Sequence, residues 1–328
     1  DGTVAYEEIT DNDVVTYRFP DRLICSKEEL IGYMVTRLNL TRRDTVIIDR
    51  TTGTGQAIVK NAYPARIGVV IHADHFNVTG TDEDHILWNN YYEYAFSQHR
   101  HIKFYIASTD VQNGLLKEQF KKYKGAKPKI VTIPVGSLKE LKRPEKGRKR
   151  HSLITASRLA SEKHVDWLIE AVAAARESVP DVSLDIYGKG VEEAKLREQI
   201  RKLNCGDCVR LCGQQKMDGI YMNYEAYLSG STSEGFGLTL MEASGSGLPI
   251  IGFDVRYGNP NFIDDGKNGY LIPVYDKMEK KERVASLTEC IVRLFTQADL
   301  EAFHAHSYEK AGAYLTKEVE KKWKELLK

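Results

Sequence analysis

The residues with the clearest chemical potential lie in segment 233–243, where two glutamates bracket two glycines. Gly235 and Gly237 lack a Cβ atom, so the backbone there can approach a ligand closely. The helix expected to follow would aim its free N–H groups at this loop, which suits phosphate or sugar oxygens. Glu234 alone would be read as a helix cap, and Glu242 alone as a solvated helix residue. Together they can each accept a pair of ligand hydroxyls, and the pair therefore favours a binding site.

A second segment, 157–163, follows a predicted strand and precedes a predicted helix. Ligands of open α/β sheets bind at such strand ends. Arg158 supplies a fork-shaped cation and Lys163 a point-like one, a combination that matches a diphosphate. Surface charges near a turn are the ordinary interpretation of such residues. The diphosphate interpretation gains weight because the Glu234 loop should reach the same edge of the same sheet.

Other motifs favour structural roles. Segment 52–56 follows a strand and contains two glycines, but it lacks the Gly-Lys-Ser/Thr ending of a phosphate loop, and Gly188–Gly190 is similarly expected to be a scaffold turn. The acidic segment 82–84 is expected to be a solvated loop or helix start. The cysteines of segment 205–212 lack a second ligand pair at zinc-finger spacing, so they are predicted to pack in the core. We therefore expect no metal site.

The elements that position these residues alternate between strand and helix. Residues 1–24 are rich in β-formers, with a turn signal at 11–13, and predict a hairpin. The alternation that follows predicts parallel sheets flanked by helices. Strands are expected at 45–49, 67–71, 103–107, 129–133, 153–155, 182–186, 209–211, 227–228 and 249–253, and helices at 85–99, 112–123, 165–179, 192–203, 218–226, from 238, and at 317–328.

The chain has 328 residues, enough for two domains. Segment 138–150 carries seven Lys and Arg residues and is interpreted as a solvated linker rather than a phosphate-attracting patch. The predicted organisation is a hairpin at 1–24, a Rossmann-like domain at 25–148, a second, nucleotide-binding Rossmann-like domain at 149–313 and a closing helix at 314–328.

Composition excludes several classes of protein. Lys and Arg total 47 against 46 Asp and Glu, a net charge of +1 that disfavours a nucleic-acid binder. No apolar run approaches the ~18 residues of a membrane span, and no signal peptide pattern is present. Five cysteines, an odd number, fit a reducing, cytoplasmic setting. The sequence starts at Asp1 without a methionine, so we expect a fragment of a longer protein.

The two charged segments resemble the signature of the retaining nucleotide-sugar glycosyltransferases of family 4, which have the GT-B fold: two doubly wound α/β domains of Rossmann type facing a central cleft. Closer resemblance, carried by Ile154–Ala160, Ser231–Ala243 and Gly252–Asn259, is to the catalytic subunit of the accessory-Sec O-GlcNAc transferase that modifies serine-rich-repeat adhesins. Wall-teichoic-acid glycosyltransferases are near relatives of that subgroup. The resemblance covers nearly the whole C-terminal half.

The resemblance implies roles for individual residues. Glu242 would hold the ribose diol of UDP-GlcNAc, and Arg158 and Lys163 would neutralise its diphosphate. A histidine after a central strand of the first domain is also implied, for which we choose His72 over His75. The remaining expected donor contacts are Glu234, Gly235, Phe236, Gly237 and Leu238 for the sugar, and Gln214 and Gln215 for the uracil.

The resemblance further implies no metal or other cofactor, a companion GT-B-like chaperone subunit, an adhesin polypeptide as acceptor, and peripheral membrane association of the complex. Residues 1–24 would be the remnant of an added β-rich domain. The family's Gly-rich loop would precede Asp1, so the fragment is expected to bind UDP weakly and to be inactive alone. Two alternatives stay open: a wall-teichoic-acid glycosyltransferase with a polyol-phosphate acceptor, and a non-catalytic GT-B chaperone subunit, although the latter should have lost the Glu, Arg and Lys set.

Overall fold

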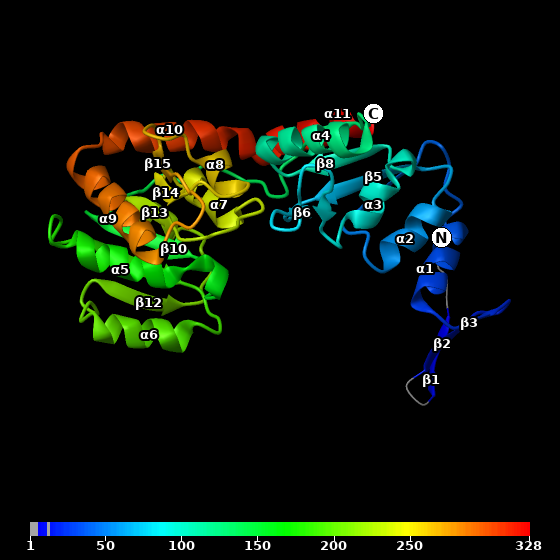
Figure 1. Cartoon of the computed structure of the whole chain (residues 1–328), viewed down its shortest axis with the longest axis horizontal. Helices are drawn as coiled ribbons and strands as arrows, with labels where there is room; N and C mark the ends of the chain where they lie inside the picture. The colour runs from blue at the N-terminus through cyan, green and yellow to red at the C-terminus, as the bar shows by residue number, and fades with distance from the viewer. Residues whose placement is uncertain (1–5, 12–13) are drawn as a thin grey trace. The chain divides into compact units, whose positions relative to one another are not determined.

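The computed structural model describes residues 6–11 and 14–328, and the chain forms two compact units that divide between Ile133 and Pro134 (Figure 1). Each unit is built around its own parallel sheet, as the alternation of strands and helices predicts. In the described part of the chain, no helix is both long and apolar enough to cross a membrane.

The first unit contains a four-stranded parallel sheet in the order β4-β5-β8-β9. Its core is formed by Val69, Ile71, Tyr92, Phe96 and Tyr105, among others. The strands are β4 (Thr45–Ile48), β5 (Arg66–Ile71), β8 (Phe104–Ala107) and β9 (Ile130–Thr132), with a small pair β6 (Phe76–Asn77) and β7 (Leu87–Trp88); the helices are α1 (Lys27–Arg37), α2 (Thr54–Asn61), α3 (Glu93–Ser97), η1 (His99–His101) and α4 (Asp110–Lys124).

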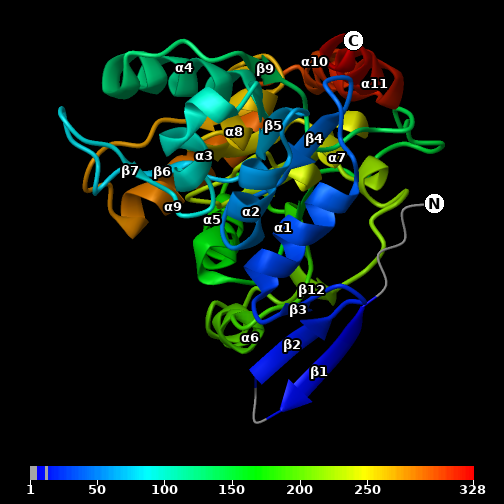
Figure 2. The ribbon, with the colours of Figure 1, turned by 90° about the vertical axis from the view of Figure 1, so that its right-hand side faces the viewer.

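A separate small sheet lies at the N-terminal end, beside α1 (Figure 2). The predicted antiparallel pair is present: β1 (Glu7–Asp11) pairs with β2 (Val14–Arg18), while residues 12 and 13 of the predicted turn lie outside the described residues. A third strand, β3 (Leu23–Ile24), was not predicted. The sheet packs on α1 through an apolar cluster of Tyr17, Phe19, Ile24 and Leu30.

The second unit contains a six-stranded parallel sheet whose order, β12-β11-β10-β13-β14-β15, reverses direction between β10 and β13. One face is covered by α5, α6 and α9 and the other by α7 and α8 (Figure 1). The strands are β10 (Ser152–Ala156), β11 (Ser183–Tyr187), β12 (Val209–Gly213), β13 (Ala226–Ser229), β14 (Ile250–Phe253) and β15 (Gly269–Ile272); the helices are η2 (Ser161–Lys163), α5 (Val165–Ala175), α6 (Glu193–Lys202), η3 (Tyr221–Asn223), α7 (Leu238–Gly245), α8 (Gly258–Phe262), α9 (Lys280–Thr296), α10 (Leu300–Ala311), η4 (Gly312–Tyr314) and α11 (Thr316–Leu327).

Two predicted helices are wrong. Within 85–99 the chain first forms β7, because Asp82 Oδ1 accepts the amides of residues 84 and 85 and turns the chain back to pair with β6. Helix α3 begins only at Glu93. Within 218–226 only the short η3 forms. There the Arg148 guanidinium binds the carbonyl oxygens of Met222 and Tyr224, which a continuing helix would have to use internally.

The basic segment 138–150 is mostly exposed, as expected of a solvated stretch, but it belongs to the second unit and does not link the two units. Its backbone bonds to the rest of the second unit at Tyr314 and Gly245, and the half-buried Arg148 side chain donates to four oxygens of that unit. Burial lowers the pKa of Arg148, which remains a cation held by those oxygens. The boundary between the units therefore falls at 133/134 rather than at the expected 148/149.

Candidate functional site

The site forms where the sheet of the second unit reverses its strand order. β10 and β13 are parallel neighbours there, and the helices that follow them, α5 and α7, lie on opposite faces of the sheet. This is the position at which open α/β sheets leave a crevice for ligands. Loop 157–163 follows β10, and loop 230–237 follows β13, so the topology brings the two charged segments to one edge.

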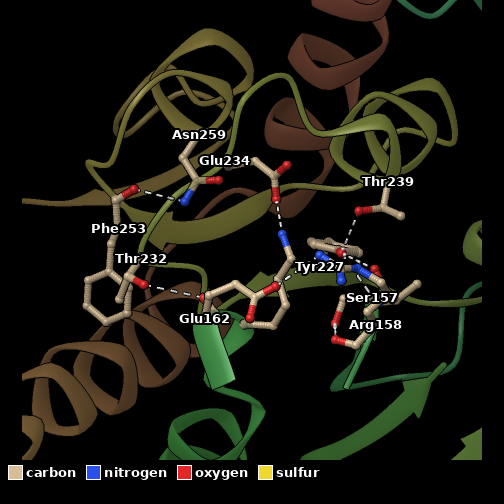
Figure 3. A network of polar contacts seen from close by, with 11 residues as sticks. Ser157, Arg158, Glu162, Tyr227, Thr232, Glu234, Thr239, Phe253 and Asn259 are labelled. Atoms are coloured by element: carbon tan, nitrogen blue, oxygen red, sulfur yellow. Dashed lines mark hydrogen bonds and ion pairs between the residues drawn. The ribbon is translucent and has the colours of Figure 1, made fainter. Parts of the chain in front are cut away.

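A glycine lets the two loops touch. A Cβ on Gly230 would lie only 2.7 Å from the carbonyl oxygen of His164 and 2.8 Å from that of Lys163. Two residues later, the amide of Thr232 donates to the carbonyl oxygen of Glu162 at 3.1 Å. The Thr232 hydroxyl donates to the same oxygen at 3.4 Å (Figure 3). Any larger residue at position 230 would push the lysine loop away from the glutamate loop.

Lys163 and Glu234 form an ion pair across these loops. Lys163 Nζ lies 2.7 Å from Glu234 Oε2, and the two side chains are 15% and 18% exposed. Figure 3 shows Glu234 projecting from its loop toward the side of the β10 loop. The pair places one cation and one carboxylate at the same point of the sheet edge, as a phosphate-and-hydroxyl site requires.

Backbone contacts fix the Glu234 loop. The amide of Glu234 donates to the carbonyl oxygen of Arg256 at 2.9 Å, and its own carbonyl oxygen accepts the amide of Gly258 at 2.7 Å. Gly237 precedes α7 in the left-handed region at φ +88°, a conformation that favours glycine. These backbone contacts hold the loop in place.

Side chains of the loop divide between core and surface. Phe236 is buried against Phe262 and Tyr314, so only its backbone is available to a ligand. Leu238, at the first turn of α7, is half exposed. Gly235, between Glu234 and Phe236, offers backbone alone. The groups of this loop that can contact a sugar are therefore the backbone amides of residues 235–237 and the carboxylate of Glu234.

A cavity of about 920 Å³ opens beside this edge, and Arg158, Gln214 and Gln215 are among its lining residues. The Arg158 side chain is 78% exposed and meets Glu162 at 3.0 Å, so its guanidinium is largely solvated. The Nε2 of Gln215 donates to the carbonyl oxygen of Cys212 at 3.1 Å, at the end of β12. The structure thus brings three of the expected donor-binding residues to one cavity.

Glu242 lies apart from that cavity. It lines a second one of about 380 Å³, and Met217 borders both. Tyr221 Oη donates to Glu242 Oε2 at 3.1 Å. Burial raises the pKa of the Glu242 carboxyl, and the Tyr221 hydrogen bond only partly opposes that shift. Sequence patterns missed Tyr221 and Met217, since neither belongs to a charged motif.

The candidate histidine belongs to the first unit. His72 follows β5, and its Nδ1 lies 3.2 Å from Oδ1 of Asp49, which follows the adjacent strand β4. The hydroxyl of the buried Tyr92 accepts the amides of His72 and Ala73 at 3.3 Å each. His75 is fully buried, with its Nε2 2.6 Å from Gln119 Oε1. Of the two histidines, His72 is the one with a partly exposed imidazole.

Two cysteines of the segment 205–212 pack in the core, as predicted. Cys205 and Cys208 are buried, and the Sγ atoms lie 3.6 and 3.4 Å from backbone carbonyl oxygens. Burial raises the pKa of both thiols. Among residues 6–11 and 14–328, no three His, Cys, Asp or Glu side chains gather as metal ligands would.

Comparison with known proteins gives consistent matches. Residues 118–297 match the family model described as glycosyl transferases group 1. The chain is 50% identical, over its whole length, to the UDP-N-acetylglucosamine--peptide N-acetylglucosaminyltransferase GtfA subunit of Streptococcus gordonii, and it spans 65% of that protein.

Two solved structures match this chain over almost its whole length. One is the pneumococcal O-GlcNAc transferase GtfA in complex with UDP and GlcNAc, at 47% identity and a TM-score of 0.91, and the other is a GtfA/B complex, at 49% identity and a TM-score of 0.94. Each match covers 98% of this chain and 64% of the other.

Proposed function

The chain belongs to the group 1 glycosyl transferases and has the GT-B fold, and from this premise we propose that it is the catalytic portion of a retaining O-GlcNAc transferase. The reaction is transfer of N-acetylglucosamine from UDP-GlcNAc to Ser or Thr hydroxyls of a polypeptide. The similarity to a protein crystallised with UDP and GlcNAc supports the donor. The name of the Streptococcus gordonii relative supports a peptide acceptor.

The observation that carries the proposal is the Lys163–Glu234 contact at the sheet's switch point. In the proposed complex, Lys163 Nζ and the Arg158 guanidinium bind the diphosphate. Glu234 and the amides of residues 235–237 bind the sugar hydroxyls. Glu242 accepts the ribose hydroxyls, and Gln214 and Gln215 lie at the uracil.

During transfer the C1–O bond to UDP breaks, and the acceptor oxygen bonds to C1 from the same face. The electron pair of the broken bond remains on the β-phosphate, where Lys163 and Arg158 stabilise the added charge. The acceptor hydroxyl proton passes to the leaving phosphate oxygen as the new bond forms. We assign His72 to the donor sugar's surroundings. The two cations already balance the diphosphate, so we propose that no metal is needed.

The partners are also part of this proposal. The similarity to a GtfA/B complex supports a companion subunit, and the GtfA relative's name supports a peptide acceptor. That the acceptor is a serine-rich-repeat adhesin of the accessory Sec system is proposed from the resemblance of the sequence motifs alone. The proposed location is the cytoplasm, at the membrane periphery. The chain spans 65% of the relative's length, and we propose that residues 1–328 alone bind UDP more weakly than the whole protein.

The test uses the full-length protein with its companion subunit. Hydrolysis of a panel of UDP-sugars should be fastest with UDP-GlcNAc. A serine-rich peptide should then accept the sugar, with the α-anomer retained. Transfer to polyol phosphate but not to peptide would overturn the acceptor assignment in favour of a wall-polymer enzyme. Absence of UDP binding would indicate a non-catalytic subunit.

A further inference from the structure

A buried carboxylate on the second strand from one edge of the second unit's sheet has no role in the site described so far. Asp185 lies on β11 and is 4% exposed. Its two oxygens accept Arg210 Nε at 2.8 Å and Nη2 at 2.6 Å, from the adjacent strand β12. Oδ2 also accepts Tyr224 Oη at 2.6 Å. A buried charge contributes little to the stability of a fold. We therefore consider which side chains Asp185 holds in position.

The hydrogen bonds continue from Asp185 to a third side chain. Tyr187 Oη lies 2.9 Å from Tyr224 Oη, and the two rings meet edge to face at 84°. Burial by itself would raise the pKa of Asp185, but the bonds from Arg210 and Tyr224 outweigh it and lower the pKa. Asp185 is therefore an acceptor only.

The negative charge of Asp185 sets the direction of the hydrogen bonds from Tyr187 through Tyr224 to Asp185. Tyr224 has one hydroxyl proton, which it donates to Asp185. It can then only accept from Tyr187, whose proton points inward. Burial, and then the bond to Asp185, raise the pKa of Tyr224, so it keeps its proton. The Tyr187 ring is thereby fixed at its outer end by a hydrogen-bonded series that ends on Arg210.

Tyr187 is also a wall of the 920 Å³ cavity. Ala156, Gln214 and Thr239 line the same cavity, which contains Arg158 at the candidate diphosphate position. The aromatic side chain therefore stands beside the segment assigned to the uracil. An aromatic ring gives a nucleobase a large flat contact, and a ring that cannot swing away limits the size of base that fits.

We propose that Tyr187 contacts the nucleobase of the donor and sets the preference for a pyrimidine over a purine, with Tyr224 and Asp185 as positioning residues. This inference rests on the proposed function, because it concerns the same nucleoside diphosphate. It adds a determinant of base choice that lies outside the charged motifs.

The experiment measures binding of UDP and ADP to the full-length protein by calorimetry. Tyr224→Phe removes the link to Asp185 without altering a cavity residue, and it should weaken UDP binding about two- to tenfold while leaving ADP binding unchanged. Tyr187→Ala should weaken UDP binding roughly tenfold or more and reduce the preference for UDP further. In turnover assays KM for UDP-GlcNAc should rise while kcat is retained, a split that general loosening of the sheet would not produce.

Tyr270→Phe provides a matched control, because Tyr270 is a buried tyrosine of the same sheet that packs on Phe303. It should leave both affinities unchanged. Circular dichroism melts establish that each variant folds, and Tyr224→Phe carries the test if Tyr187→Ala does not. A folded variant that keeps the wild-type UDP-to-ADP ratio would overturn the inference. A wild-type protein that binds no UDP would instead overturn the proposed function.

Discussion

Replacing Lys163 by alanine separates the catalytic and structural roles of its ion pair with Glu234. Pairs exposed to solvent contribute about 0–1 kcal/mol, and breaking a fully buried pair costs about 3–5 kcal/mol. With side chains 15% and 18% exposed, this pair lies between those limits. We expect Lys163→Ala to lower the free energy of unfolding by about 1–3 kcal/mol.

The effect on turnover should be larger than the effect on stability. Loss of one donor to a developing negative charge typically lowers kcat about 10²- to 10³-fold. We expect that range for Lys163→Ala, measured as UDP-GlcNAc turnover by the full-length protein with its companion subunit and a peptide acceptor. Adding Glu234→Gln removes the unpaired carboxylate, so the double variant should regain stability in urea but not turnover.

Lys280→Ala is the matched control. Lys280 pairs with Asp166 and Glu170 at 3.1 and 2.8 Å in the same unit, and none of these three residues lines the 920 Å³ cavity. Its loss should leave turnover unchanged. Near-normal kcat in Lys163→Ala, or recovery of kcat in the double variant, would refute the assignment of Lys163 to the diphosphate.

Further predictions concern three other contacts and the metal. Because burial raises the pKa of Glu242, it should protonate at a higher pH than an ordinary glutamate. Affinity for UDP-GlcNAc should therefore fall as pH drops through that range, and calorimetry should find this dependence absent in Glu242→Gln. Asp49→Ala frees His72 Nδ1 and should lower kcat more than Asp49→Asn does, in the same turnover assay. Arg148→Met leaves several carbonyl oxygens unpaired and should cost about 2–4 kcal/mol in urea unfolding, with little change in KM. EDTA dialysis should leave turnover unchanged; a loss restored by Mn²⁺ would contradict the proposed charge balance.

The charged motifs could be predicted because each needs only local information. Glu234 can be recognised from the neighbouring glycines, and Lys163 from its place after a predicted strand. The parallel topology brings the two residues together. Tyr187 and Tyr221 could not be found this way. The role of Tyr187 depends on which strands are neighbours and on the buried Asp185, whose partner Arg210 lies 25 residues further along the chain. The role of Tyr221 depends on its contact with Glu242, which lies 21 residues away.

Two of the errors, at 218–226 and at 138–150, share a cause. The segment before β13 has helical periodicity. Its carbonyl oxygens nevertheless accept hydrogen bonds from Arg148, which lies far away in the sequence. The same arginine belongs to a basic run that resembles a linker in composition. Its guanidinium forms four hydrogen bonds that no local pattern reveals. Tertiary contacts therefore override local propensity at both places.

The anchoring of Arg148 has a consequence for exchanging parts between related enzymes. A hybrid joined at the end of segment 138–150 would take Arg148 and its carbonyl partners in the second unit from different parent proteins. It would do the same to Lys142 and the cavity that Lys142 lines together with Glu242. A crossover placed ahead of Pro134 would carry that whole stretch with its own sheet. The segment to be exchanged as one piece therefore begins at Pro134, well before β10, the first strand of the second unit.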